Sequence, residues 1–174
     1  MKFRKAIPDD LEQAWQIIKD AKALMASEGR HQWTEEYPAK DTIKADIDSG
    51  EAYVLNDDDS KAIAYAVITA KGEAAYNHIE GQWITSGPYL TIHRLAVAEA
   101  WRRHGLAREM MLRAEEIATN STIASIRVDT NNDNTAMLNL LKSLNYTYCG
   151  IVSYGERGTR EAFEKEWGMY TNTK

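Results

Sequence analysis

The sequence predicts an α/β protein built on one mixed sheet with helices on both faces. Strand and helix patterns alternate through the second half of the chain, whereas the first half contains a run of strand patterns joined as a meander. The chain has 174 residues, of which 44% are hydrophobic, so it can bury a core without disulfides or metals. We therefore expect one domain over 1–174.

The first half is expected to hold a strand, two helices and two further strands. Pro8 and the two carboxylates after it predict the start of the first helix, because proline and acidic side chains suit the free N–H groups of a helix start. An aromatic-rich loop over 29–40 separates the two helices. In order, the expected elements are a strand at 2–6, helices at 8–29 and 41–48, and strands at 52–56 and 62–70.

The second half begins with a long connection over 71–88, which contains one helical turn. Gly105 precedes an amphipathic helix, and Asp133 with Asn134 is expected to cap the next helix. The expected elements are strands at 89–97, 125–130, 146–154 and 159–167, and helices at 105–119 and about 134–144.

Composition excludes several classes of function. A formal net charge of −5 and a pI of about 5.4 argue against a nucleic-acid-binding protein and against a polybasic membrane surface. The one cysteine, Cys149, allows no internal disulfide. The N-terminal residues hold no apolar run, and no stretch is long enough to cross a membrane, so we expect a cytoplasmic protein without a membrane partner.

The stretch WRRHGLAREMM, residues 101–111, places basic side chains before Gly105 at a helix start. The first N–H groups of a helix have no internal acceptor and carry partial positive charge. Because Gly105 and Ala107 are small, a bulky anion such as a diphosphate could touch this backbone, and Arg102, Arg103 and Arg108 could add charge. The alternative interpretation is a solvated turn that only starts a helix.

The segment HRLAVAEAWRRHGLAREMMLRAEEIA resembles the acyl-CoA motif of the GNAT-type N-acetyltransferases, in which Arg102, Gly105 and Ala107 fill the three fixed positions. VDTNNDNTAMLNLLKSLNYTYCG resembles the next strand and helix of that family, and FRKAIPDDLEQAW its opening, so the resemblance covers nearly the whole chain. It implies a mostly antiparallel central sheet and transfer of an acetyl group from acetyl-CoA to an amine. It leaves a homodimer open, since dimers are common in the family.

The resemblance also implies a set of cofactor-binding residues. Backbone at Leu95, Ala96 and Val97 would pair with the pantetheine arm of acetyl-CoA. Asn134 matches a position that often contacts the cofactor, although a plain helix cap explains it equally well. The diphosphate would lie on the N–H groups of Arg103, His104, Gly105, Leu106, Ala107 and Arg108.

Acetyl transfer needs a group that takes a proton from the amine, because an alkyl amine is almost wholly protonated at neutral pH. His93 is the first candidate, since alternation puts it on one face with Leu95 and Val97 and its ordinary pKa lies near 7. A structural histidine bonded to backbone is the alternative. Glu51 and Glu80 are in reserve.

Leu141 occupies the position where many family members carry a tyrosine that protonates the leaving sulfur. Leucine cannot donate a proton, and the sequence does not decide between Tyr146, Tyr148, Cys149 and unassisted departure. The same departure motivates a second hypothesis, a sensor that binds acyl-CoA without turnover.

In the family that the chain resembles, the loop after the first helix lines the acceptor cleft, which implies an acceptor side where His31, Trp33 and Tyr37 could form an aromatic wall. Glu35 and Glu36 could attract a cationic amine of a small molecule or a peptide. The alternative is that Trp33 and Tyr37 pack the loop onto the core. We expect no metal, because the four histidines show no zinc-ligand spacing.

Overall fold

The computed structural model describes residues 1–168 and divides them into two compact units. Unit 1 contains residues 1–69 and 92–114, and unit 2 contains residues 70–91 and the chain from Glu115 onward. Strand β5 and helix α3 each begin in one unit and end in the other. One domain over the whole chain stays a prediction.

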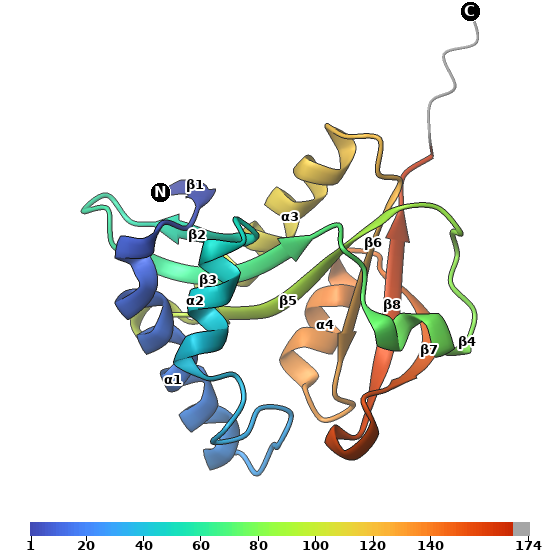
Figure 1. Cartoon of the computed structure of the whole chain (residues 1–174), viewed down its shortest axis with the longest axis horizontal. Helices are drawn as coiled ribbons and strands as arrows, with labels where there is room; N and C mark the ends of the chain where they lie inside the picture. The colour runs from blue at the N-terminus through green and yellow to red at the C-terminus, as the bar shows by residue number, and fades with distance from the viewer. Residues whose placement is uncertain (169–174) are drawn as a thin grey trace, which may run out of the picture. The chain divides into compact units, whose positions relative to one another are not determined.

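The fold is a mixed, mostly antiparallel eight-stranded sheet with four α-helices among the described residues (Figure 1). The strand order is β1-β2-β3-β5-β6-β8-β7-β4, and β5 with β6 is a parallel pair. The elements are β1 (Lys2–Lys5), α1 (Leu11–Ser27), α2 (Lys40–Asp48), β2 (Ala52–Asn56), β3 (Ala62–Thr69), β4 (Glu80–Gly81), β5 (Tyr89–Val97), α3 (Leu106–Thr119), β6 (Ser125–Thr130), α4 (Thr135–Ser143), β7 (Thr147–Ser153) and β8 (Thr159–Glu166).

In unit 1, β1, β2 and β3 are antiparallel neighbours, with β2 and β3 consecutive in the chain as the predicted meander requires. Helices α1 and α2 lie side by side over these strands (Figure 1). A 3₁₀ turn at Pro8–Asp10 leads into α1, and the Asp10 carboxylate accepts two hydrogen bonds from Arg4, at 2.7 and 2.9 Å. All eight residues of β3 are buried, so both faces of this strand are covered. The core between the helices and the strands includes Ile18, Ile43, Val54 and Tyr65, each 0% exposed.

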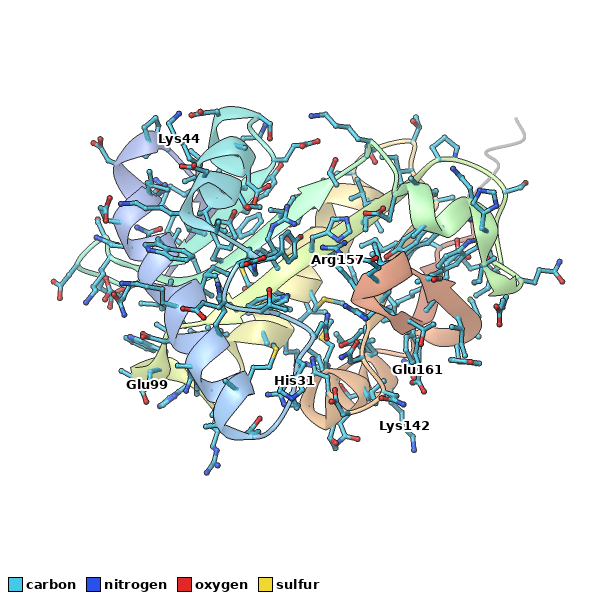
Figure 2. All side chains as sticks on the ribbon, turned by 60° about the horizontal axis from the view of Figure 1, so that its bottom comes forward. His31, Lys44, Glu99, Lys142, Arg157 and Glu161 are labelled. Carbon is cyan, nitrogen blue, oxygen red and sulfur yellow. The ribbon has the colours of Figure 1, made fainter. Side chains whose placement is uncertain are left out.

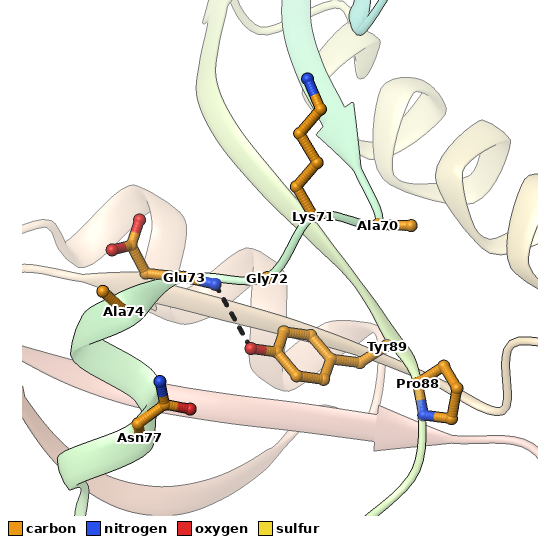
Figure 3. A pocket seen from close by; sticks show the side chains of 8 residues that line it. All are labelled: Ala70, Lys71, Gly72, Glu73, Ala74, Asn77, Pro88 and Tyr89. Atoms are coloured by element: carbon orange, nitrogen blue, oxygen red, sulfur yellow. Dashed lines mark hydrogen bonds between the residues drawn. The ribbon is translucent and has the colours of Figure 1, made fainter.

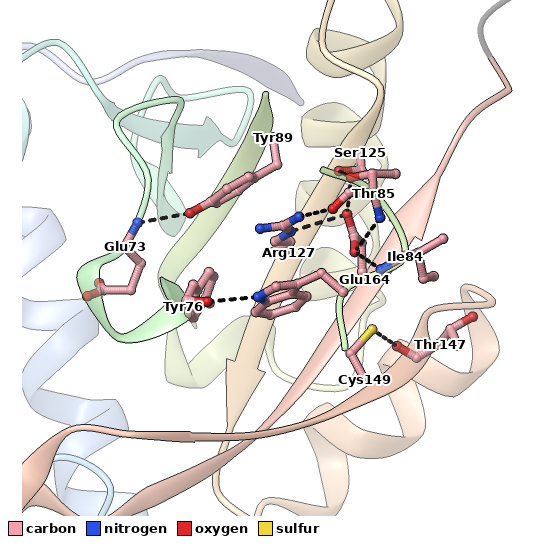
Figure 4. A network of polar contacts seen from close by, with 11 residues as sticks. Glu73, Tyr76, Ile84, Thr85, Tyr89, Ser125, Arg127, Thr147, Cys149 and Glu164 are labelled. Carbon is pink, nitrogen blue, oxygen red and sulfur yellow. Dashed lines mark hydrogen bonds and ion pairs between the residues drawn. The ribbon is translucent and has the colours of Figure 1, made fainter. Parts of the chain in front are cut away.

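In unit 2, β6, β8 and β7 form an antiparallel sheet, and the connection 71–88 is tied to it by an ion pair with little exposure to solvent. Arg127 of β6 pairs with Glu164 of β8 at 3.2 Å, with side-chain exposures of 7% and 0%. Glu164 also accepts hydrogen bonds from the backbone amides of Ile84 and Thr85, at 2.6 and 3.3 Å (Figure 4). The pair therefore joins two strands to a loop that has little regular structure of its own.

Aromatic rings complete the surroundings of Arg127. Its guanidinium lies 4.4 Å from the ring centre of Trp83 and 4.0 Å from that of Tyr89. At the far end of β6, Asp129 accepts hydrogen bonds from the hydroxyls of Tyr76 and Tyr154, both at 2.7 Å. The side chains of Arg127 and Asp129 thus anchor residues 76–89 to the sheet of unit 2.

The predicted strands and helices are confirmed within a few residues at each end, and one strand is new. The two-residue strand β4 pairs with β7, and its sequence, Glu80–Gly81, has no apolar pattern from which a strand could be predicted. A Cβ on Gly81 would lie 2.1 Å from the carbonyl oxygen of Cys149. Because glycine has no Cβ, the two backbones can approach closely enough to pair, and this pairing makes Glu80–Gly81 a strand.

We expect Arg127→Met to lower the free energy of unfolding by about 3–5 kcal/mol, because it leaves the Glu164 carboxylate buried without its cation. Urea unfolding measures the loss, and hydrogen exchange should speed up at the amides of Ile84 and Thr85. Lys142→Met, at an exposed lysine of α4, is the control and should change neither quantity. Equal behaviour of the two variants would contradict the role of the ion pair.

Candidate functional site

Strand β5 carries the residues predicted to pair with the pantetheine arm and to take the proton, and its backbone is irregular. Arg94 has φ +52°, a left-handed conformation in the middle of the strand. For a residue with a Cβ this conformation costs roughly 1–2 kcal/mol. The strict alternation that put His93 on one face with Leu95 and Val97 holds only for extended residues, so that prediction fails at Arg94.

Arg94 is held by Asp46 and Tyr37, and Asp46 is held in turn by Tyr65. Its guanidinium makes a bidentate ion pair with Asp46 of α2, with Nε–Oδ2 and Nη2–Oδ1 distances of 2.8 and 2.7 Å. Its third nitrogen donates to the hydroxyl oxygen of Tyr37 at 2.8 Å, and the Tyr65 hydroxyl donates to Asp46 at 2.8 Å. Although burial disfavours its charge, the hydrogen bonds to Asp46 and the charge of Asp46 raise the pKa of Arg94.

His93 lies next to this cluster and is partly buried. Burial, and then the charge of Arg94, lower the pKa of His93 to about 4, while Glu51 acts in the opposite direction. The expectation of a pKa near 7 was therefore wrong. The imidazole is neutral at neutral pH, so it is in the form that accepts a proton, but it is a weak base.

The start of α3 has the geometry of an anion cradle. Gly105 has φ +78°, and a Cβ built on it would meet no other atom within 4 Å. The Glu109 amide donates to the Gly105 carbonyl at 3.0 Å, the first helical hydrogen bond of α3. The amides of Gly105, Leu106 and Ala107 therefore have no acceptor within the helix and point out of its start.

The basic side chains around this turn have different roles. Arg102 donates to the backbone carbonyl of Asp20 in α1 at 3.1 Å, so its guanidinium fastens the turn to α1. His104 is exposed, and its Nδ1 lies 2.8 Å from the carbonyl oxygen of Arg102. Arg103, at φ +65°, and Arg108 have exposed side chains, which suits contact with a phosphate from solution.

In unit 2, Asn134 forms the N-cap of α4. Its side-chain oxygen accepts from the Met137 amide at 3.3 Å, and its amide nitrogen donates to Thr130 at 3.0 Å. The plain helix cap that the sequence left open is thus present, and contact with a cofactor stays a prediction.

The residues weighed as proton donors to sulfur also lie in unit 2. Leu141 is 0% exposed and belongs to the core. Burial raises the pKa of Tyr146 and of Cys149, which makes both weaker acids, while Tyr148 is 54% exposed.

The loop between α1 and α2 holds the three predicted acceptor residues. Trp33 packs against the core of unit 1, as its alternative interpretation expected, and the Tyr37 hydroxyl binds Arg94. His31 is exposed on this loop (Figure 2). Lys22 of α1 donates to the carbonyls of Glu35 and Pro38 at 2.8 and 2.9 Å, so the loop is fastened to the helix before it.

A hollow of about 470 Å³ lies in unit 2 (Figure 3). The Tyr89 hydroxyl accepts a hydrogen bond from the Glu73 amide at its wall, at 3.3 Å. None of the predicted site residues lines it; the lining residues are Ala70, Lys71, Gly72, Glu73, Ala74, Asn77, Pro88 and Tyr89.

Among residues 1–168, no group of three or more His, Cys, Asp or Glu side chains is placed to hold a metal ion. Within the same part of the chain, no helix has the length and apolar character needed to cross a membrane.

Comparison with known proteins identifies the family. Residues 13–146 match the model of the acetyltransferase (GNAT) family. The chain belongs to the GNAT acetyltransferase family. It is therefore a GNAT N-acetyltransferase family enzyme, and the family uses acetyl-CoA and acetylates amine acceptors.

Solved structures of GNAT proteins share the fold of this chain. A GNAT-family acetyltransferase from Streptococcus agalactiae 2603 is 32% identical, with a TM-score of 0.85 over 95% of each chain. One from Listeria monocytogenes 4b F2365 is 17% identical, with a TM-score of 0.75 over 95% of this chain and 94% of that one. The ribosomal-protein-S18-alanine N-acetyltransferase from Escherichia coli is 17% identical, with a TM-score of 0.63 over 94% and 90%. A comparison with curated proteins found no match.

Asp46 and Tyr65 are the residues that the sequence analysis missed. Asp46 is one carboxylate among several in a short, polar helix, and Tyr65 lies in an apolar strand. The one local signal was Arg94 itself, a permanently charged residue inside the mostly apolar strand YLTIHRLAV. A buried arginine requires an anionic partner, but the sequence does not say which carboxylate supplies it.

The lowered pKa of His93 predicts a pH dependence of stability. Because the unfolded chain binds this proton below pH 6.5 and the folded protein only below about pH 4, stability falls as the pH falls between these values. The loss is at most about 3 kcal/mol. The difference in unfolding free energy between the wild type and His93→Gln should therefore change across this window, whereas His78→Gln, at an exposed histidine, should track the wild type. Parallel curves for all three proteins would contradict the buried neutral imidazole.

Proposed function

We propose that this GNAT enzyme transfers the acetyl group of acetyl-CoA to a primary amine of a small molecule or a peptide, by direct attack in a ternary complex. The amine nitrogen bonds to the thioester carbonyl carbon, the carbon–sulfur bond breaks, and the amine loses a proton. Coenzyme A leaves as a thiolate and takes up a proton. The observation that carries the proposal is the open, basic turn at the start of α3.

The residues of this turn fit a diphosphate. The space in front of Gly105 is empty of protein atoms within 4 Å of a Cβ position, and the outward amides supply hydrogen-bond donors. Exposed Arg103 and Arg108 supply positive charge. Each charge-assisted hydrogen bond contributes roughly 1.5–3 kcal/mol, so a few of them suffice for firm binding.

In this proposal His93 accepts the proton of the amine through water. With a pKa of about 4, the imidazole is neutral at the pH of the cell but weakly basic. The ammonium proton of the acceptor goes to solvent before the attack, because so weak a base cannot remove it. His93 takes the second proton, which the nitrogen releases more readily once it has attacked the carbonyl. Leu141 donates no proton, so the thiolate takes its proton from water.

The second candidate is a protein that binds acetyl-CoA without turnover. The buried leucine at position 141, where many relatives carry a tyrosine, favours it. Release of free thiol from acetyl-CoA in the presence of a panel of primary amines distinguishes the two, because only an enzyme releases thiol in step with acetylated amine.

Acetyl-CoA binding should depend on the space in front of Gly105. We expect Gly105→Ala to weaken binding at least tenfold in isothermal titration calorimetry, because the methyl group occupies the position of the diphosphate. Gly50→Ala is a matched control, since Gly50 also has positive φ, at +72°, and a Cβ there meets only Lys5 at 3.8 Å. Absence of binding to the wild type at millimolar acetyl-CoA would sink the proposed function.

Removing the imidazole should affect turnover rather than cofactor binding. His93→Ala is expected to lower kcat at least tenfold while the dissociation constant for acetyl-CoA stays within threefold. His78→Ala removes an exposed histidine and should leave both unchanged. Unaltered kcat in His93→Ala would assign His93 a structural role.

A further inference from the structure

We propose that Arg94 and Asp46 form a positioning pair that holds β5 in its irregular shape and so sets where His93 and the backbone of Leu95–Val97 lie. The inference rests on the proposed function, because those residues are the ones assigned to proton transfer and to the pantetheine arm. Neither member of the pair is assigned a contact with the reacting atoms.

Arg94 has a left-handed backbone conformation in the middle of β5. A left-handed arginine inside a strand is unfavourable, and such residues persist where the surrounding structure holds them. Glycine would adopt φ +52° without strain, yet the chain has an arginine there. The side chain must therefore contribute contacts that offset the strain of the backbone.

The hydrogen bonds of the Arg94 side chain offset the strain of its backbone. The two-pronged geometry with Asp46, at 2.8 and 2.7 Å, fixes the direction of the guanidinium as well as its distance. Both side chains are largely shielded from water, with exposures of 14% and 12%. Tyr65 and Tyr37 each add one hydrogen bond at 2.8 Å. Helix α2 and the loop before it thereby fix one residue of β5, and Tyr65 of β3 fixes the carboxylate that binds it.

The conformation of Arg94 also affects how the side chains before and after it in β5 are oriented. If residue 94 returned to extended backbone, the side chains before and after it would regain strict alternation, and His93 would turn relative to Leu95 and Val97. The charge of Arg94 also acts on His93, together with that of Glu51. The groups around Arg94 are Asp46, Tyr37, Tyr65 and His93, so Asp46 is its one anionic contact among the described residues.

A pair of double variants separates positioning from a general effect on stability. Arg94→Gly with Asp46→Asn and Arg94→Val with Asp46→Asn both remove the ion pair and leave no unpaired charge. Glycine accepts positive φ, whereas valine, which is β-branched, resists it. Asp48→Asn is the control, because it breaks an exposed ion pair with Lys44 on the same helix.

We expect the glycine variant to lose about threefold in acetyl-CoA affinity and in kcat/KM, because positive φ stays accessible but the pair no longer holds it. The valine variant should lose at least thirtyfold in both. Crystal structures should show positive φ at residue 94 in the first and negative φ in the second. If the valine protein fails to fold, Arg94→Ala with Asp46→Asn replaces it. Equal losses in the glycine and valine variants, or no loss in either, would overturn the proposal.

Failure of the proposed function and failure of the positioning role give different experimental results. If the wild type binds acetyl-CoA but acetylates no amine, the proposed function fails. The affinities and the φ values at residue 94 then still decide whether the pair positions β5.

Discussion

The bidentate contact between Arg94 and Asp46 joins helix α2 to a strand whose backbone is strained at that point. Its strength comes from geometry and shielding: two nearly parallel hydrogen bonds, little water, and a tyrosine hydroxyl on each partner. The residues that follow Arg94 in the chain lead through Val97 to the turn at Gly105. The shape of β5 at residue 94 thus bears on His93 and on the backbone that we propose to bind the pantetheine arm.

Unit 2 uses the same kind of contact for a different purpose. Arg127 and Glu164 lie on neighbouring strands, and the loop amides of Ile84 and Thr85 bind the carboxylate. In unit 1 an ion pair shielded from water holds the left-handed residue of β5, and in unit 2 another holds the connection 71–88. Such a pair stabilises only while both partners are present, because a single buried charge is strongly unfavourable. This makes each pair a specific determinant of local shape rather than a general source of stability.

The chemistry proposed for the enzyme divides between backbone and side chains. Diphosphate binding depends on amides at a helix start, which any sequence with small residues at Gly105 and Ala107 could present. Proton transfer depends on the surroundings of one imidazole, whose pKa is set by burial and by the charge of Arg94. The first is a property of local backbone geometry, and the second of neighbours that come from other parts of unit 1.

The sequence by itself determined the order of the elements, the meander in the first half, the family and the turn before α3. The elements and the turn follow from patterns of residues close in the chain, such as the apolar spacing of α1 or the glycine before a helix, and the family follows from its motif. Only the tertiary structure decided the left-handed backbone of Arg94, the low pKa of His93 and the strand β4. The contacts responsible are Arg94 with Asp46, 48 residues apart, and Gly81 with the backbone of Cys149. No periodicity or spacing encodes which distant carboxylate or carbonyl arrives at a given position, because that depends on how separate elements pack.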